Sequence, residues 1–594
     1  MLKPKIKAAA LATIGTVVLG ACVGSIIVWQ VLGWNEDDND APYENQFESE
    51  LGVYTQAAIA TDAPYCSDIG KNIFEKGGNV IDAAIAALLC VGLIQNQSMG
   101  LGGGFLAVFY NATSKEAKTL NARDRAPLAA TENMFEGNPD AAARGPLSVA
   151  VPGELKGYWE LWKEHGSRSI TWKELFEPTI QLAENGFNLT GHAANALYQN
   201  RERILNTPSL REVFVNNQTG EVFKTGDLIK RPVLAATLRE LSEAQEGDVL
   251  YRETEMMRKF VEDIRNEGGI LTEQDMLNYN VTWDPPVEMA IAGNYTLHSF
   301  PPPASGILIA FFLKLLSNYT MNPNDVVTYQ RITEAFKHGY AKRTFLGDPE
   351  DSGVAEQVEE LYNNLTSIDY INQIIELIHD DSTNQTHEYY GAEYYQPDDH
   401  GTSTMSLIAP NGDAIAVTST VNLYFGSMLR SRQTGIIYND MMDDFSSPNI
   451  TNAFGVPPSV NNFIKPGKRP VSSMTPTIFT DSEGKVRLVI GGAGGTQITT
   501  SVTLVAIRNL WFGENIKEAI DARRMHHQLY PMRIDCEAGF SSDIVEGLEA
   551  IGHVVEQPET FIVGSSVVQA ISVVENGTIY ANSDFRKQGT VAGF

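Results

Sequence analysis

The residue pair Gly401-Thr402, which precedes a run of strand-forming residues at 403–407, has the chemistry of a site of self-cleavage. Glycine has no side chain to hinder attack on its own carbonyl carbon, and the Thr402 hydroxyl is the adjacent nucleophile. Attack by this hydroxyl would move the acyl group from nitrogen to oxygen, and water would then hydrolyse the ester and part the chain. The freed threonine amine, with an ordinary pKa near ~8, would serve as base for the hydroxyl beside it. An ordinary loop-to-strand junction has the same local pattern, so the neighbouring residues must decide.

A predicted β-hairpin brings a second hydroxyl toward Thr402. The strand-like runs 403–409 and 413–421 flank Pro410-Asn411-Gly412, and an Asn-Gly pair between two such runs is a strong hairpin signal. Thr420 lies near the end of the second run, so its hydroxyl can approach Thr402 across the ladder. The alternative is that Thr420 is a plain β-branched strand residue.

The segments around this hairpin predict helices packed on antiparallel strands. Residues 78–94 are apolar on nearly every face, which indicates a buried helix, and residues 106–110 indicate a buried strand. A further strand at 486–490 leads into a glycine-rich loop, and a helical run follows at about 497–511. Together these segments predict a layered sandwich of the α+β class.

The glycine-rich loop is interpreted as an anion-binding nest. The backbone N–H groups of Gly494 and Gly495 would stabilise a negatively charged tetrahedral oxygen. A nucleotide-binding loop is excluded, because no lysine follows and the Gly-x-Gly-x-x-Gly spacing breaks at Gln497.

Composition narrows the class of protein. The 594 residues, of which 43% are hydrophobic and 20% charged, are typical of a globular chain with two to four domains or one large domain. The net charge of −29 argues against nucleic-acid binding and means that an anionic substrate needs a specific positive contact. No Cys-x-x-Cys or His-Glu-x-x-His spacing occurs, so we expect neither a metal ion nor a cofactor.

The N-terminal segment predicts a membrane anchor. Three lysines precede an uncharged run at 8–34, which is long enough to cross a ~30 Å hydrocarbon layer as a helix, and four acidic residues follow it. This charge order predicts a cytoplasmic tail at 1–7, a transmembrane signal anchor at 8–34, a stalk at 35–50 and an extracellular body, as in a single-pass type II protein of the plasma membrane. A cleaved signal peptide, which has a shorter apolar stretch, and a lipoprotein processed at Cys22 are the alternatives.

Sequons and cysteines agree with a secretory route. Ten Asn-x-Thr triplets are candidate glycosylation sites: Asn111, Asn188, Asn217, Asn280, Asn294, Asn318, Asn364, Asn384, Asn449 and Asn576. In an oxidising compartment Cys66 and Cys90, which are close in sequence, are the expected disulfide, contributing roughly 3 kcal/mol and leaving Cys536 unpaired.

Several segments occur in an order typical of one enzyme family. They are 77–84 (GGNVIDAA), 99–104 (MGLGGG), 121–123 (NAR), 418–427 (TSTVNLYFGS), 443–445 (DDF), 472–474 (SSM) and 494–497 (GGTQ). On these segments the chain resembles the γ-glutamyltransferases, or glutathione hydrolases, of the N-terminal-nucleophile superfamily, from about residue 50 to Phe594. The resemblance implies a four-layer αββα sandwich, self-cleavage before Thr402, and a heterodimer of a large subunit, 51–401, and a small catalytic subunit, 402–594.

The resemblance also implies the chemistry. Thr402 would take the γ-glutamyl group of glutathione or its S-conjugates as an ester and pass it to water, an amino acid or a dipeptide, without metal or cofactor. Thr420 would orient Thr402, and Gly494 and Gly495 would bind the oxyanion.

The substrate-binding residues implied by the resemblance surround the α-carbon of the glutamyl group. The Arg123 guanidinium would hold the α-carboxylate bidentately, while Asp444 and Asn422 would accept hydrogen bonds from the α-ammonium. The remaining candidates are Ser472 and Ser473, which would contact the carboxylate, and Tyr424, which would line or gate the pocket.

Three departures from the family pattern leave alternatives open. Met441 stands where the family commonly has Glu or Gln, Thr404 stands where it often has His, and a second cysteine pair seen in some relatives is missing. The first two departures favour one alternative, a catalytically impaired surface glycoprotein. Another alternative is an acylase for other amides, although a simple acyl group would not need the carboxylate contacts of Arg123.

Overall fold

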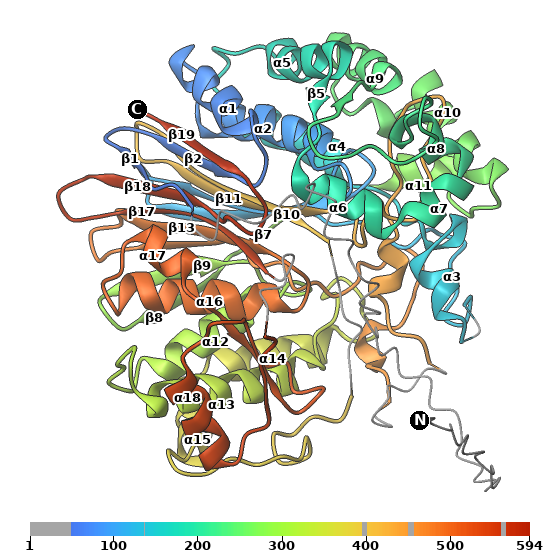
Figure 1. Ribbon diagram of the computed structural model, residues 1–594. Coiled ribbons are helices and arrows are strands. Elements are labelled where there is room, and N and C mark those ends of the chain that lie inside the picture. The colour runs from blue at the N-terminus through green and yellow to red at the C-terminus, as the bar shows by residue number, and fades with distance from the viewer. Residues whose placement is uncertain (1–48, 136, 395–400, 449–456, 560–565) are drawn as a thin grey trace, which may run out of the picture.

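Two β-sheets are stacked face to face, and helices cover the outer face of each sheet (Figure 1). This computed structural model describes residues 49–135, 137–394, 401–448, 457–559 and 566–594. All strand pairs of the two large sheets are antiparallel. The layers therefore run helices, sheet, sheet, helices, as the predicted αββα sandwich requires.

The first large sheet holds the strand that begins beside Thr402. Its strands, in spatial order, are β19 (Thr590–Gly593), β2 (Ala58–Thr61), β10 (Ser403–Ile408), β11 (Ala414–Thr420), β3 (Gly104–Asn111), β4 (Glu116–Ala122) and β7 (Thr282–Asp284). Strands from the beginning, the middle and the end of the chain meet here, so the sheet depends on contacts distant in sequence.

The second large sheet lies against the first. Its strands, in spatial order, are β1 (Gly52–Tyr54), β18 (Ile579–Ser583), β17 (Val567–Val573), β13 (Val486–Ala493), β12 (Thr477–Thr480), β9 (Tyr295–Ser299) and β8 (Val287–Ile291). Two small sheets complete the strands of the described residues: β14 (Met525–His526), β15 (Ile534–Cys536) and β16 (Val555–Glu556), and β5 (Phe187–Asn188) with β6 (Leu228–Ile229).

One group of helices covers the first sheet. It comprises α1 (Cys66–Glu75), α2 (Val80–Ile94), α4 (Glu154–His165), α5 (Trp172–Asn185), α6 (Gly191–Gln199), α7 (Arg201–Asn206), α8 (Pro208–Phe214), α9 (Pro232–Glu243), α10 (Glu255–Asn266) and α11 (Glu273–Asn278), with the short α3 (Pro139–Ala143) beside them. The other group, under the second sheet, comprises α12 (Gly306–Leu316), α13 (Val326–Arg343), α14 (Ala355–Thr366), α15 (Ile368–Leu377), α16 (Gln497–Leu510), α17 (Ile516–Asp521) and α18 (Ser542–Ile551).

Strand β3 shows why its residues form a buried central strand. Phe105 and Phe109 belong to the core between the first sheet and its helices, whereas Leu106 and Val108 belong to the core between the two sheets. Alternate side chains of a strand point to opposite faces, so a strand buried on both faces is apolar throughout. The predicted buried strand at 106–110 is therefore confirmed.

The predicted hairpin is also confirmed. Strands β10 and β11 pair in register, with Ser403 opposite Ser419 and Ile408 opposite Ala414. The turn contains Gly412, whose φ of 86° lies in the left-handed region that glycine adopts readily. This register brings the end of β11, at Thr420, beside the start of β10.

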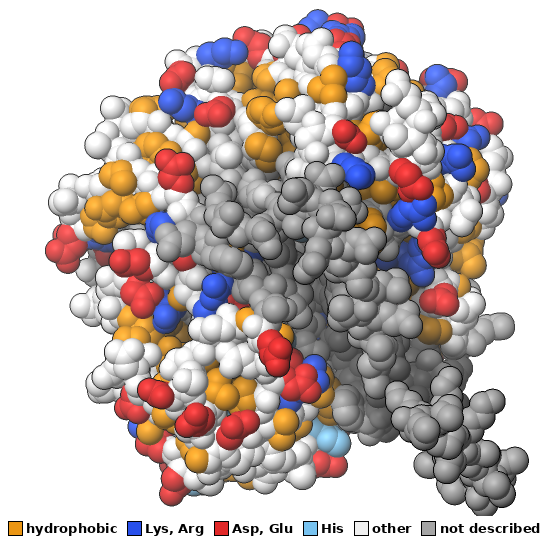
Figure 2. All heavy atoms as spheres, viewed as in Figure 1, with side chains coloured by type: hydrophobic (Ala, Val, Ile, Leu, Met, Phe, Trp, Pro, Cys, Tyr) orange, Lys and Arg blue, Asp and Glu red, His pale blue; other side chains and the backbone are white. Residues whose placement is uncertain are grey.

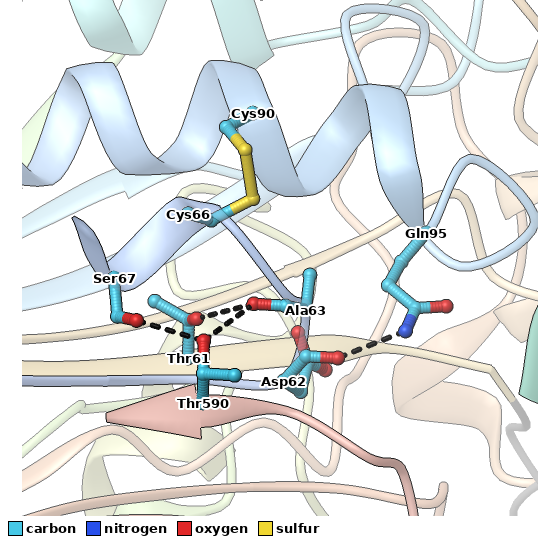
Figure 3. Close-up of a disulfide and its surroundings, with 8 residues drawn as sticks. All are labelled: Thr61, Asp62, Ala63, Cys66, Ser67, Cys90, Gln95 and Thr590. Carbon is cyan, nitrogen blue, oxygen red and sulfur yellow. Dashed lines mark hydrogen bonds between the residues drawn. A yellow bond between two sulfur atoms is a disulfide. The ribbon is translucent and has the colours of Figure 1, made fainter. Parts of the chain in front are cut away.

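Helix α2 confirms the predicted buried helix. It begins after Asn79, whose side chain accepts hydrogen bonds from the backbone N–H groups of Ile81 and Asp82, while Asp82 accepts one from Asn79. This reciprocal cap satisfies N–H groups that the first turn leaves without partners. A disulfide joins Cys90 of α2 to Cys66 at the start of α1 (Figure 3), as predicted, across a separation of 24 residues, and Cys536 is a free, buried thiol.

The predicted membrane anchor, and the plasma-membrane localisation derived from it, are corrected. Residues 1–48, with the tail at 1–7, the anchor at 8–34 and nearly all of the stalk, lie outside the described residues. Within the described ranges, no helix is both long enough and apolar enough to span a bilayer. The apolar helix α2 has 15 residues, about 22 Å at ~1.5 Å per residue, and it packs in the protein core.

The surface carries charges of both signs. On the face drawn in Figure 2, acidic and basic side chains are interspersed. Most candidate glycosylation sites are exposed: Asn188, Asn217, Asn280, Asn294, Asn318, Asn364 and Asn576, with Asn111 and Asn384 partly exposed. Asn449 lies outside the described residues. Glycosylation itself stays a prediction.

Candidate active site

Two threonine hydroxyls meet at the Gly401 carbonyl group. Thr402 Oγ1 contacts the Gly401 carbonyl oxygen, and Thr420 Oγ1 lies 3.3 Å from the same oxygen. The backbone N–H of Asn422 donates to Thr420 Oγ1 at 2.8 Å, which fixes that hydroxyl. Both threonines are buried, at 5% and 4% exposure. The Thr402 hydroxyl is thus held against the carbonyl oxygen of the preceding residue, with the Thr420 hydroxyl beside the same oxygen.

Gly401 is required by its surroundings. Its φ is 78°, and a Cβ atom at this position would lie 2.3 Å from the Asn422 carbonyl oxygen. Backbone atoms cannot yield as the end of a flexible side chain can, so a larger residue would displace the carbonyl group that the threonines contact.

A buried ion pair that the sequence analysis did not single out lies on the other side of Thr402. Lys587 Nζ donates to the Thr402 carbonyl oxygen at 2.6 Å and to Ser403 Oγ at 3.0 Å, and it pairs with Asp62 Oδ2 at 2.7 Å. Burial lowers the pKa of Lys587, and the Asp62 carboxylate opposes that shift. No sequence motif marks either residue, because they lie at opposite ends of the chain and meet only through the pairing of β19, β2 and β10.

The loop of Gly494 and Gly495 follows a strand that crosses over β10. A Cβ atom on Gly491 would lie 2.2 Å from Thr404 Oγ1, so β13 passes directly over the strand that begins beside Thr402. Gly494 and Gly495 have φ values of 120° and 62°, and their carbonyl oxygens accept the first hydrogen bonds of α16. The sequence-predicted nest therefore lies at the N-terminus of a 14-residue helix, where backbone N–H groups favour anions.

Arg123 lies at a second, charged corner of the site. Its guanidinium pairs with the Asp444 carboxylate, donates to the Val471 carbonyl oxygen at 3.2 Å, and has Met441 Sδ 2.8 Å from Nη1. All three side chains are buried. The predicted carboxylate-binding and ammonium-binding residues are thus brought together, and the thioether of Met441 is their direct neighbour.

Ser472 and Ser473 follow Val471 and so lie beside this corner. Ser473 Oγ accepts a hydrogen bond from Arg343 at 2.7 Å, and Ser472 Oγ accepts one from the Met474 N–H at 3.2 Å. Both serines are buried. Arg343 was not predicted from the sequence.

The segment 440–444 connects the two regions. The Asp440 carbonyl oxygen accepts from the Asn422 side chain at 3.2 Å, while Asp444, at the end of a 3-10 helix (Met441–Asp444), reaches Arg123. The Asp440 carboxylate is itself occupied, since it accepts from the Leu423 N–H at 3.0 Å and pairs with Arg144 at 2.9 Å. Burial raises the pKa of Asp440, and the Arg144 guanidinium opposes the shift.

Tyr424 and Thr404 have defined hydrogen-bond partners. The Tyr424 hydroxyl lies 3.1 Å from His192 Nε2, and burial raises the pKa of Tyr424 to about 12. Thr404 Oγ1 donates to the Val417 carbonyl oxygen at 3.1 Å and lies 3.2 Å from Thr418 Oγ1. Thr404 therefore lies between the two sheets, with Gly491 of β13 directly over its hydroxyl.

Comparison with solved structures defines the class of fold. Cephalosporin acylase from Bacillus halodurans aligns with a TM-score of 0.79 over 94% of this chain and 99% of that one, and the 23% sequence identity shows shared fold alone. γ-Glutamyltranspeptidase from Helicobacter pylori is 29% identical with a TM-score of 0.51, over 58% of this chain and 95% of that one. The fold is the mixed α/β sandwich of the N-terminal-nucleophile hydrolases.

The sequence comparisons then give the family. Residues 66–594 match the profile described as Gamma-glutamyltranspeptidase, so the chain belongs to the γ-glutamyltranspeptidase family. Scoloptoxin SSD14 of Scolopendra dehaani is 41% identical over 552 residues, covering 92% of this chain and 93% of that protein. Glutathione hydrolase proenzyme 1 of Schizosaccharomyces pombe is 35% identical over 596 residues, covering 97% and 91%. The predicted family, and the prediction of an enzyme, are confirmed.

Proposed function

We propose that this protein is a γ-glutamyl transferase and glutathione hydrolase that makes its own nucleophile by cleavage between Gly401 and Thr402. The observation that carries the proposal is the meeting of the Thr402 and Thr420 hydroxyls at the Gly401 carbonyl group. Membership of the γ-glutamyltranspeptidase family supports it, as do the relatives named glutathione hydrolase proenzymes.

Self-cleavage would proceed in two steps. Thr402 Oγ1 attacks the Gly401 carbonyl carbon, the C–N bond to Thr402 breaks, and the nitrogen gains the proton that the hydroxyl loses. Water then hydrolyses the ester, which leaves a carboxylate on Gly401 and a free amine and hydroxyl on Thr402. The products are the large subunit ending at Gly401 and the small subunit 402–594, which stay together because their strands share both sheets.

Turnover would use the same hydroxyl on a substrate amide. The Thr402 amine takes the hydroxyl proton, the oxygen attacks the γ-carbonyl carbon, and the leaving amine departs with a proton, which gives a γ-glutamyl ester. The N–H groups of Gly494 and Gly495 would bind the oxyanion of the tetrahedral intermediate. Water or the amine of an acceptor then attacks the ester and regenerates Thr402.

The charged corner would recognise the glutamyl end. Arg123 would bind the α-carboxylate, which frees Asp444 to accept from the α-ammonium together with Asn422, and Ser472 and Ser473 lie close enough in sequence to Val471 to line the same pocket. Tyr424 would form part of the wall. The net charge of −29 makes such a specific cationic contact necessary for an anionic donor.

The test is the hydrolysis of a chromogenic γ-glutamyl anilide by the wild-type protein and by Thr402→Ala. We expect the variant to remain a single chain and to lose at least roughly 10³-fold in turnover. In the wild type, reciprocal plots at several concentrations of a dipeptide acceptor should be parallel, as ping-pong kinetics require. Equal turnover by the two proteins would end the proposal.

A second candidate function is favoured by Met441. A thioether in contact with Arg123 replaces an acceptor for the α-ammonium, and Asp440 does not compensate, because Arg144 and the Leu423 N–H occupy its carboxylate. The chain would then cleave itself yet turn over γ-glutamyl donors weakly. A processed wild-type protein that releases no aniline from the γ-glutamyl anilide would identify this case.

A further inference from the structure

The buried Lys587–Asp62 pair is built around the backbone of the nucleophile. Lys587 lies between β18 and β19, and Asp62 directly follows β2; both side chains are almost completely buried, at 2% and 0% exposure. In Figure 3, Gln95 at the end of α2 reaches Asp62, whose carbonyl oxygen accepts from the Gln95 side chain at 2.9 Å. The Asp62 carboxylate also accepts from the Thr404 N–H at 3.3 Å. Strands β2, β10 and the C-terminal segment are thereby tied together at Thr402.

A buried ion pair at this place calls for a functional explanation, because removing two charges from water costs free energy. A buried ion pair is often no more stabilising than apolar residues of the same volume. Here the pair is also incompletely satisfied, since Asp62 Oδ1 has no hydrogen-bond partner within the described residues. The feature that sets it apart is that Nζ donates to the carbonyl oxygen of Thr402 itself.

We propose that Lys587, held by Asp62, is a positioning residue that anchors the Thr402 carbonyl during self-cleavage and afterwards keeps the new Thr402 amine uncharged. The inference rests on the proposed function, in which that amine is the base.

The electrostatic argument follows from the position of the lysine. The amine and the carbonyl oxygen of one residue are separated by three bonds, so an ammonium bonded to the oxygen lies about 5 Å from the amine. A positive charge at this distance disfavours a second one and lowers the pKa of the amine. Asp62, whose carboxylate pairs with Nζ, offsets part of this effect.

Other titratable groups near Thr402 do not replace Lys587. Glu154, on α4, accepts from Ser419 at 2.9 and 3.0 Å across the ladder from Ser403, and burial raises its pKa to about 8. Burial lowers the pKa of His192 well below its usual range, and the positive charge of Lys587 lowers it further. Both are mainly neutral near pH 7, so Lys587 and Asp62 are the charges that act on the amine.

The experiment measures the titration of the Thr402 amine without any substrate. Cyanate carbamylates unprotonated amines, and mass spectrometry of the small subunit reports modification at its N-terminus as a function of pH. The proteins are the wild type, K587M, K587R and the double variant D62N/K587M. The exposed Lys485, which pairs with Glu483, provides the control K485M.

The expected results distinguish an effect of the Lys587 charge from an effect of its packing. In K587M the pH of half-modification rises by about one to two units, because Asp62 is left without its counter-charge. In D62N/K587M the pH of half-modification falls back toward the wild-type value. In K587R and K485M it stays within about half a unit of the wild-type value. In each variant, the acid limb of the pH–rate profile for kcat/KM shifts in the same direction as the pH of half-modification. A purely structural pair predicts instead that the titration of the Thr402 amine does not move and that the activity of each variant falls by the same factor at every pH.

Processing supplies a second readout if K587M does not mature. Denaturing gels follow conversion of the precursor to two fragments, and circular dichroism verifies folding. A folded K587M protein that stays a single chain beside a cleaved K587R protein supports the proposal, because cleavage then requires the charge. Normal cleavage of K587M with an unshifted amine titration would overturn it, as would equal impairment of K587R and K587M. Failure of the proposed function would show separately, as processed wild type without turnover.

Discussion

The region around Thr402 and the region around Arg123 are built in opposite ways. Thr402 and Thr420 are neutral hydroxyl residues held by strand register, with the Lys587–Asp62 pair behind them. Arg123 directly follows β4, and Asp444 ends a 3-10 helix; these two charged side chains pair with each other, and Met441 Sδ also contacts the Arg123 guanidinium. The first region has the groups that the proposed self-cleavage needs, while the second has Met441 at the position where the family resemblance implies a hydrogen-bond acceptor.

Under the proposed function, this difference means that self-cleavage and turnover are separable. Self-cleavage depends on backbone geometry at 401–402, which the two sheets impose, and it needs no substrate recognition. Turnover also requires a pocket for the glutamyl end, which depends on a few side chains. Changes in the first region should therefore abolish maturation, whereas changes in the second should alter KM in a protein that matures normally.

The largest effect is expected for Gly401→Ala. The new Cβ would lie 2.3 Å from the Asn422 carbonyl oxygen at a φ of 78°, so the Gly401 carbonyl must move away from the two threonines. We expect cleavage to slow at least roughly 100-fold, measured on gels over time. Gly577→Ala is the control, because Gly577 has a φ of 86° but no atom within 4 Å of its added Cβ. Cleavage of Gly401→Ala at the control rate would contradict the account.

Arg123→Lys tests the region around Arg123, where we expect an effect on KM and none on cleavage. A lysine keeps the charge near Asp444 but loses the planar fork that holds a carboxylate through two bonds. We expect normal cleavage and a KM for γ-glutamyl anilide that rises roughly ten- to a hundredfold. Arg125→Lys, at a half-buried arginine that pairs with Glu350, should leave KM unchanged. An unaltered KM in Arg123→Lys would remove Arg123 from the donor pocket.

Met441→Gln should improve donor binding. The amide oxygen offers the α-ammonium an acceptor where the thioether now lies, and a hydrogen bond to a charged group contributes roughly 1.5–3 kcal/mol. We expect KM to fall about tenfold with the extent of cleavage unchanged. Met441→Leu, which keeps the apolar character, should behave as the wild type. If KM rises in Met441→Gln, the ammonium is bound elsewhere.

The smallest effect on activity is expected for Glu154→Gln, which reports on stability. Because burial raises the pKa of Glu154 from 4.5 to about 8, the folded chain keeps a proton that the unfolded chain loses above about pH 4.5. The stability due to the neutral carboxyl is thus fully present below pH 4.5 and is lost as the pH rises to about 8. The difference in the free energy of unfolding between the variant and the wild type, measured with denaturant, should shift in favour of the variant by on the order of 3–5 kcal/mol from pH 4.5 to pH 8. Glu164→Gln, at an exposed position of the same helix, should show no such gain.

Much of the fold could be predicted because its signals are local. The Asn-Gly turn fixed the position of β10 and β11, the unbroken apolar run of 78–94 gave α2, and sequence proximity gave the disulfide of Cys66 and Cys90. The order of the strands in the two sheets has no such local signal, because β2, β10 and β19 come from three distant parts of the chain.

The residues of the candidate site also fall into two groups: those with a local sequence signal and those without one. Thr402, Thr420 and the glycine loop are marked by motifs, and Arg123 and Asp444 were predicted together through the family resemblance. Lys587, Asp62 and Arg343 were missed, since a lysine or aspartate without a motif is usually a surface residue, and only the folded chain shows that these are buried. The membrane anchor was inferred from a segment outside the described residues, and no described helix supports it.

Intact mass spectrometry of the freshly purified full-length protein tests the central claim most directly. The account predicts two polypeptides, one of which begins at Thr402 with a free amine, while Thr402→Ala yields a single polypeptide. A folded wild-type protein that persists as one uncut polypeptide would contradict it, and so would a break at any other bond.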